Sequence, residues 1–368
     1  MQTKDTAAGY TLGPMPKSDR RLRLLLVFWI GAAGFGGILS FARQPAADGQ
    51  LQFADLGACQ LVSGRQIEHC RLGYRTYGKL NADRSNAILF PSWFSGTSES
   101  LSGVVGPNSL VDPARYFLIT VDALGDGVSS SPSNSSSQHG PDFPGFTIQD
   151  MVNAGHRLAT ETLGLKHLHA VMGISMGGQQ TFEWMVDYPD FMDVAIPIVG
   201  SPHPNSRDLL LYRADMDAVK SDPDWHDGRY TKPPTALVAQ LIWELNLTTP
   251  EQYARTHTRE SFQTEYGQMR TKGILPFDAN DWIAQLEAIL HLDIAHGGSM
   301  EDAARHVKAR VLVVSAAQDH MVNPKPALDF AKLIGAKTFI LQGDCGHIAV
   351  GCESAALDPV VRAFLDGR

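Results

Sequence analysis

The pentapeptide Gly173-Ile174-Ser175-Met176-Gly177 follows an apolar run, residues 168–172, and precedes a segment with a helical pattern. A serine between glycines at a strand-to-helix turn has a strained backbone and an exposed hydroxyl, and the glycines leave room for an ester. The N–H groups at the start of the following helix point toward the charge that develops during acyl transfer. The pattern predicts a nucleophile elbow, although G-x-S-x-G also arises by chance in a chain with 34 glycines.

Two further apolar runs lead to an acid and a base. Residues 311–314 read as a buried strand and lead to Asp319, and residues 338–341 lead to His347. Open α/β sheets place their sites beyond the carboxyl ends of their strands. The chain order Ser, Asp, His is the one expected of an α/β-hydrolase, so these positions strengthen the prediction for Ser175.

The three side chains have complementary chemistry. A serine hydroxyl is a poor nucleophile at neutral pH, so His347 is expected to take its proton and return it to the leaving group. Asp319 is expected to fix the imidazole tautomer and to stabilise its protonated form. Asp344 is the rival acid, but it lies three residues before His347 on the same loop, where a turn contact is expected instead.

An oxyanion hole needs two backbone N–H donors, usually one from the residue after the serine and one from a loop after an early strand. Met176 provides the first by its position. Residues 87–90 read as a strand that runs into residues 91–97, so the second donor is expected to be the N–H of Phe94 or of Trp93. Only the backbone is required, so either side chain is free to pack in the core.

Length and composition predict one large α/β domain with an insertion. The chain has 368 residues, 43% of them hydrophobic, and a net charge of −8. The expected fold is a mostly parallel central sheet flanked by helices, with the core in residues 46–202 and 307–368. Residues 203–306 change to helical stretches such as 235–245 and 282–292, which predicts a helical lid. The sequence has no basic stripe and no Cys/His zinc spacing, so it indicates no nucleic acid, metal or cofactor.

The first 45 residues differ from the rest. Residues 24–42 carry no charge and follow four basic residues between positions 17 and 23. This pattern predicts an export signal that directs the remaining chain to the periplasm or the medium. Ser40 and Ala42 offer a small-x-small cleavage site, while the apolar length of 19 residues also suits an uncleaved anchor in the inner membrane.

Four cysteines agree with export. If Gly64-Arg65 is a two-residue hairpin turn, Cys59 and Cys70 lie directly opposite one another, at a distance that permits a disulfide. Cys345 and Cys352 bracket His347, and a disulfide there would clamp the loop. In a reducing compartment, all four would instead be small apolar side chains.

Several motifs outside the nucleophile elbow resemble those of a known family. Over roughly residues 65–355 the chain resembles the homoserine O-acetyltransferase family of α/β-hydrolase proteins, through Asp150-Met151-Val152, the run from Gly173 to Gln180, Glu183-Trp184, Tyr188-Pro189, Asp222-Pro223-Asp224-Trp225 and Phe277-Asp278-Ala279-Asn280. The last two motifs, in the predicted lid, are more specific than the elbow, which many hydrolases share. By position, the resemblance implies a triad of Ser175, Asp319 and His347.

The sequence differs from that family at positions where family members are expected to bind homoserine, the acyl acceptor. Members that acetylate homoserine carry an aspartate after the histidine, suited to an amino group, and tend to have a basic residue before the Phe-Asp motif. This chain has Ile348 and Pro276 at those positions, and an apolar side chain cannot hold an ammonium. Residues 122–129 resemble the D-x-x-G-x-G-x-S loop of general α/β-hydrolases.

The expected function is therefore an exported serine acyl hydrolase of the esterase type, which cleaves a small ester through an acyl-enzyme. Two alternatives stay open: an O-acyltransferase that uses acyl-CoA and an alcohol at the same site, and a non-catalytic binding protein. The sequence decides neither the natural ester nor the oligomeric state.

Overall fold

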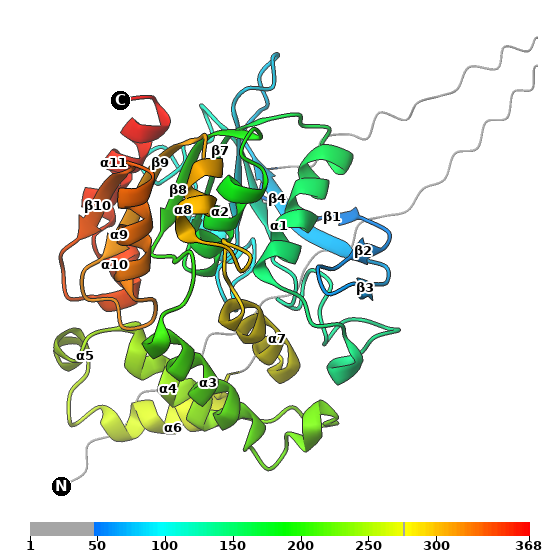
Figure 1. Cartoon of the computed structure of the whole chain (residues 1–368). Helices are drawn as coiled ribbons and strands as arrows, with labels where there is room; N and C mark the ends of the chain where they lie inside the picture. The colour runs from blue at the N-terminus through cyan, green and yellow to red at the C-terminus, as the bar shows by residue number, and fades with distance from the viewer. Residues whose placement is uncertain (1–47, 275–276) are drawn as a thin grey trace, which may run out of the picture. The chain divides into compact units, whose positions relative to one another are not determined.

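The computed structural model describes residues 48–274 and 277–368. An eight-stranded sheet runs through this part (Figure 1), in the order β1-β4-β6-β5-β7-β8-β9-β10. The strands are β1 (Gln52–Asp55), β4 (Arg71–Tyr77), β5 (Ala87–Pro91), β6 (Phe117–Val121), β7 (Leu168–Ile174), β8 (Met192–Ile198), β9 (Arg310–Ala316) and β10 (Lys337–Leu341).

The sheet is mostly parallel, as the sequence predicts. From β6 to β10 each neighbouring pair runs parallel, whereas β1 pairs with β4 and β4 with β6 in antiparallel fashion. The apolar runs at 87–90, 168–172, 311–314 and 338–341 all lie in strands. Their carboxyl ends share one edge of the sheet, so the loops that follow them meet there.

Both faces of the sheet are covered, which explains the continuous apolar strands. Neighbouring residues of β9, Val313 and Leu312, belong to separate cores on opposite faces. On the face of Val313 the core includes residues of α1 (Ile148–Arg157), α2 (Met176–Asp187) and α9 (Pro324–Leu333). On the face of Leu312 it includes η1 (Ser100–Val104), α10 (Ala349–Cys352) and α11 (Ser354–Leu365).

Helices occupy the chain between β8 and β9, where the sequence predicts a lid. They are α3 (Ser206–Lys220), α4 (Leu237–Leu247), α5 (Pro250–Thr256), α6 (Phe262–Lys272), α7 (Ala279–Leu290) and α8 (Met300–His306). The predicted stretches 235–245 and 282–292 correspond to α4 and α7. In Figure 1, α3, α4 and α6 gather beyond one end of the sheet, while α8 lies beside α2. The remaining helical elements are the short 3-10 helices η2 (Gly140–Asp142), η4 (His226–Gly228) and η5 (Gly346–Ile348), and the π-helical segment η3 (Leu158–Thr162) that follows α1.

Both predicted disulfides are present, but the predicted hairpin register is wrong. Cys59 bonds to Cys70 with a Cα–Cα distance of 5.6 Å. In the hairpin of β2 (Cys59–Gln60) and β3 (Gln66–Ile67), however, Cys59 faces Ile67.

The turn explains this difference. It closes by a hydrogen bond from the N–H of Leu61 to the oxygen of Arg65, with Gly64 at a φ of 80°, so the loop has three residues rather than two. Beyond β3 the chain turns back, and the N–H of Cys70 donates to the oxygen of Gly57. This return brings Cys70 beside Cys59.

No helix among residues 48–274 and 277–368 is long and apolar enough to cross a membrane. The predicted export segment, residues 24–42, lies outside the described residues, as does Pro276.

Candidate active site

Ser175 occupies the turn between β7 and α2 with a strained backbone, at φ 57° and ψ −121°. A Cβ on Gly173 would lie 2.3 Å from the oxygen of Gly177, and a Cβ on Gly177 would lie 2.4 Å from the oxygen of Pro91. Neither position accepts a side chain without a backbone shift, because both contacts are with backbone atoms. The N–H of Ser175 donates to the oxygen of Ile198 at 2.9 Å, which fixes the turn against β8.

The predicted acid and base form one hydrogen-bonded row with Ser175. The Oγ of Ser175 lies 2.8 Å from Nε2 of His347, and Nδ1 of His347 lies 2.7 Å from Oδ2 of Asp319. Oδ1 of Asp319 accepts from the N–H groups of Met321 and Val322, at 2.8 and 2.9 Å. Asp319 is 7% and His347 8% exposed, so the acid and the base are nearly closed to solvent. The geometry permits a proton to pass from Ser175 to His347 while Asp319 holds the ring.

The rival acid, Asp344, has a different partner. Its carboxylate receives hydrogen bonds from the guanidinium of Arg255 in α5, and this pairing lowers its pKa. Its backbone oxygen accepts from Oγ1 of Thr249 at 2.5 Å. A Cβ on Gly346, which has a φ of 66°, would lie 3.0 Å from Cα of Thr248. The junction of α4 and α5 therefore packs against the loop that carries His347.

The candidate oxyanion donors are the N–H of Met176, next to Ser175 in the chain, and that of Phe94, which lines the same cavity as Ser175. Within the described residues, neither the N–H of Met176 nor that of Phe94 donates a hydrogen bond to a protein group, while the N–H of Ser95 donates to Oε1 of Gln285 at 3.0 Å. Both free N–H groups are therefore available to a ligand oxygen.

The loop that carries Phe94 is fixed by two buried polar side chains. Gln285, from α7, is fully buried, and its Nε2 also donates to the oxygen of Leu124 at 3.1 Å. Asp122 accepts from the N–H of Ser98 at 2.5 Å and from its Oγ at 2.7 Å. Burial raises the pKa of Asp122, and the bonds from Ser98 oppose that shift.

A cavity of about 640 Å³ opens at Ser175, which is within the usual range for small-molecule sites. Its walls are mainly apolar or aromatic and include Trp93, Phe94, Trp243, Leu247 and Ile348. The ring centroid of Phe94 lies 4.5 Å from that of Trp243, in a tilted arrangement, and 4.6 Å from that of Trp282, edge to face, so the loop of Phe94 packs against α4 and α7. Among the described residues that line the cavity there is no lysine or arginine, and Asp358 is the single carboxylate.

Sequence reasoning missed the contributions of the insertion to this site. Gln285, Trp243 and Leu247 carry no motif. Trp243 and Leu247 line the cavity of Ser175, and Gln285 bonds to the loop of Phe94, only because the helices fold back over the end of the sheet. The aromatic content of residues 235–245 was the one available signal, since a tryptophan on a predicted lid helix is a candidate for the cavity wall.

The fold and the geometry at Ser175 are those of an α/β-hydrolase. Residues 87–351 match the family described as the alpha/beta hydrolase fold, and the chain belongs to it. It is 33% identical over 326 residues to an ethyl acetate hydrolase of Pseudomonas veronii, covering 84% of this chain and 93% of that protein.

A homoserine O-succinyltransferase of Ralstonia pickettii is 32% identical over 350 residues, covering 83% of this chain and 86% of that protein. The structure of an acetylester hydrolase from Corynebacterium glutamicum has a TM-score of 0.79 at 29% identity, covering 86% of this chain and 95% of that one. The resemblance to homoserine acyltransferases is thus confirmed, and esterases stand beside them.

Proposed function

We propose that the chain is a serine acyl hydrolase that cleaves small uncharged esters through an acyl-enzyme on Ser175. His347 removes the proton as Oγ of Ser175 attacks the ester carbonyl, and the N–H groups of Met176 and Phe94 receive the oxyanion. The tetrahedral intermediate then collapses, and His347 returns the proton to the departing alcohol. Water attacks the acyl-enzyme by the same route and releases the acid. The esterase relatives support an ester bond as the substrate.

The chemistry of the cavity wall favours hydrolysis over transfer to homoserine. Homoserine carries an ammonium and a carboxylate, and both need partners when they leave water. The described lining has no cation for the carboxylate, its single carboxylate for the ammonium is Asp358, and the position after His347 is the apolar Ile348, 42% exposed and part of the wall. The missing partner of the carboxylate would cost several kcal/mol of acceptor binding, on the order of 10³-fold in preference. Water needs no such partners.

A partition experiment tests this proposal. The enzyme receives a neutral acetyl ester together with millimolar homoserine, and free acetate and O-acetylhomoserine are measured in the same sample. Acetate should dominate, and Ser175→Ala should reduce it to the background rate. The same assay with acetyl-CoA as donor examines the transferase alternative, which the homoserine acyltransferase relatives favour. Mostly O-acetylhomoserine from either donor would overturn the hydrolase proposal.

Labelling separates an enzyme from a non-catalytic binding protein. A fluorophosphonate should attach to Oγ of Ser175 in the native protein and fail to attach in Ser175→Ala. Because His347 must activate the serine, His347→Ala should also suppress labelling. A native protein that stays unlabelled while it binds esters would support the binding-protein alternative.

The helical insertion, residues 203–306, is proposed to act as a lid, since Trp243 and Leu247 of α4 form part of the cavity wall. Export is proposed as well, on the uncharged run at 24–42 and its basic flank. The two disulfides agree with an oxidising compartment. Thiol titration of unfolded protein from the exported fraction should find fewer than two free thiols per chain, and an unexported protein with four thiols would contradict this proposal.

A further inference from the structure

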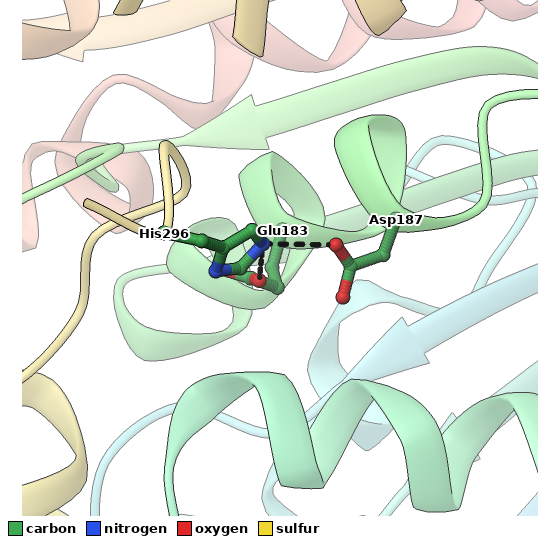
Figure 2. Close-up of side chains that lie close together, drawn as sticks. All are labelled: Glu183, Asp187 and His296. Atoms are coloured by element: carbon green, nitrogen blue, oxygen red, sulfur yellow. Dashed lines mark hydrogen bonds and ion pairs between the residues drawn. The ribbon is translucent and has the colours of Figure 1, made fainter. Parts of the chain in front are cut away.

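Three ligating side chains meet at the end of α2 that lies away from Ser175. Glu183 and Asp187 are four residues apart on this helix and therefore lie on one face, and His296 approaches from the loop between α7 and α8 (Figure 2). Nε2 of His296 lies 3.1 Å from Oε1 of Glu183 and 3.0 Å from Oδ1 of Asp187. The rise of the helix separates this cluster from Ser175 by ~12 to 18 Å, so it is no part of the proposed active site.

Hydrogen bonds leave one buried carboxylate oxygen unsatisfied. Glu183 is 1% exposed, and its Oε1 has no hydrogen-bond partner among the described residues. Nε2 of His296 can carry one hydrogen. The hydrogen-bond geometry directs it toward Asp187 and not toward Glu183. Oε1 of Glu183 therefore has an ion-pair contact of 3.1 Å with Nε2 of His296 but no hydrogen bond, and an ion pair without a hydrogen bond repays the desolvation of a buried carboxylate only in part.

We propose that Glu183, Asp187 and His296 bind a divalent transition-metal ion of the zinc type. A tetrahedral ion with bonds of ~2.0 Å would place its ligand atoms ~3.3 Å apart, and the two distances from Nε2 are 3.1 and 3.0 Å. An imidazole nitrogen with two carboxylate oxygens is a donor set that such ions accept, with water as the fourth ligand. The two carboxylates also carry two negative charges. A divalent ion balances both of them, whereas a single protonated imidazole balances only one.

The surroundings fit a metal site in two further respects. Nε2 of Gln149 donates to Oδ2 of Asp187 at 2.9 Å and so orients the carboxylate, as outer hydrogen bonds do around metal ligands. A cavity of about 390 Å³ reaches Glu183 and His296, which gives an ion and its water a route from solvent. The ion would hold the loop after α7 against α2, the helix that begins beside Ser175.

Metal binding by the purified full chain, prepared without a histidine tag, tests the proposal. After equilibration with Zn²⁺ and dialysis against metal-free buffer, elemental analysis should find one zinc per chain, and added Zn²⁺ should raise the Tm. X-ray absorption should report nitrogen and oxygen ligands without sulfur. Glu183→Gln and His296→Asn should each bind zinc at least ~10-fold more weakly.

His291→Asn is the matched control, because His291 lines the same cavity without belonging to the three ligands. It should bind zinc as the unmodified chain does. If Glu183→Gln does not fold, His296→Asn decides the question, since His296 is 39% exposed in its side chain and tolerates replacement. Failure of the unmodified chain to retain zinc, or equal affinity in His296→Asn, would show that the cluster is an ion-pair network only. Either outcome leaves the proposed hydrolase activity untouched, because that activity is measured separately.

Discussion

Residues that contribute no side chain set the backbone conformation of Ser175. The positive φ of the serine is imposed by β7, by the hydrogen bond to Ile198 and by the close passage of Gly173 past Gly177. Such strain costs on the order of 1–3 kcal/mol and persists only where the surroundings determine it.

The acid assignment gives the first prediction at the residue scale. Asp319→Asn should lower kcat by on the order of 10⁴-fold, since the amide favours the wrong imidazole tautomer. Asp344→Asn should retain most activity, because Asp344 pairs with Arg255 rather than with His347. Steady-state hydrolysis of a chromogenic acetate ester measures both. The opposite pattern, with Asp344→Asn inactive and Asp319→Asn active, would reverse the assignment.

Gln285 gives the second prediction, as a positioning residue for the oxyanion loop. Gln285→Ala removes the acceptor of the Ser95 N–H and the donor to Leu124. The loss should lower kcat by ~10- to 100-fold with little change in KM, because the oxyanion donors act mainly in the transition state. Glu287→Ala, on the same helix but half-exposed, is the control and should keep the native kcat. A change in KM alone for Gln285→Ala would argue against this role.

Sequence predicts the triad residues better than their supports, for a physical reason. Ser175, Asp319 and His347 each follow a strand, and parallel strands bring their carboxyl ends together without further information. Gln285 and Trp243 depend on how the insertion folds over that edge, which no local pattern encodes. The row of three could therefore be named from the chain, whereas the contact between Gln285 and Ser95, 190 residues apart, could not.

At the scale of elements, the hairpin of β2 and β3 shows how the length and the position of a turn together set the register. A two-residue turn at Gly64-Arg65 would pair Cys59 with Cys70, but the three-residue loop pairs Cys59 with Ile67. Gly64 adopts a positive φ, as glycine often does in hairpin turns, but it occupies the last position of the loop rather than the first. The sequence predicts the bounds of α4 and α7 to within a few residues, because each helix has a sustained apolar pattern.

The two disulfides give the third prediction. They close loops of similar length, with sequence separations of 11 and 7, so chain entropy assigns each about 2–3 kcal/mol. Cys345→Ala with Cys352→Ala frees the loop of His347 and should lower kcat by about 10-fold or more, because small misplacements are costly. Cys59→Ala with Cys70→Ala, outside the Ser175 cavity, should lower stability similarly and leave kcat unchanged. Equal kcat losses in both pairs would reject a positioning role for the second disulfide.

At the scale of the whole molecule, the chain has a net charge of −8 and nevertheless buries some of its carboxyl groups. Asp215 accepts from Nε1 of Trp282 at 2.6 Å and joins α3 to α7. Asp281 accepts from the N–H of Ser133 at 2.9 Å and so holds the serine-rich loop to α7. Burial raises the pKa of Asp215 and of Asp281 to about 7 in each case. Asp215 therefore joins two helices of the insertion, whereas Asp281 ties the insertion to the rest of the fold.

The last prediction concerns the pH dependence of stability. An unfolded aspartate loses its proton near pH ~3.9, whereas folded Asp215 and Asp281 keep theirs up to pH about 7. Between these values the native state binds more protons than the unfolded state, so the free energy of unfolding falls as pH rises and levels off above the folded pKa. Each group contributes at most about 4 kcal/mol to this fall.

Asp215→Asn should flatten the profile, because the amide keeps an acceptor for Trp282 and carries no titrating proton. Urea unfolding at about pH 5 and about pH 8 measures the difference. Asp217→Asn, at an exposed position of the same helix, should keep the native slope. A profile for Asp215→Asn as steep as that of the unmodified chain would mean that the fall arises from other groups.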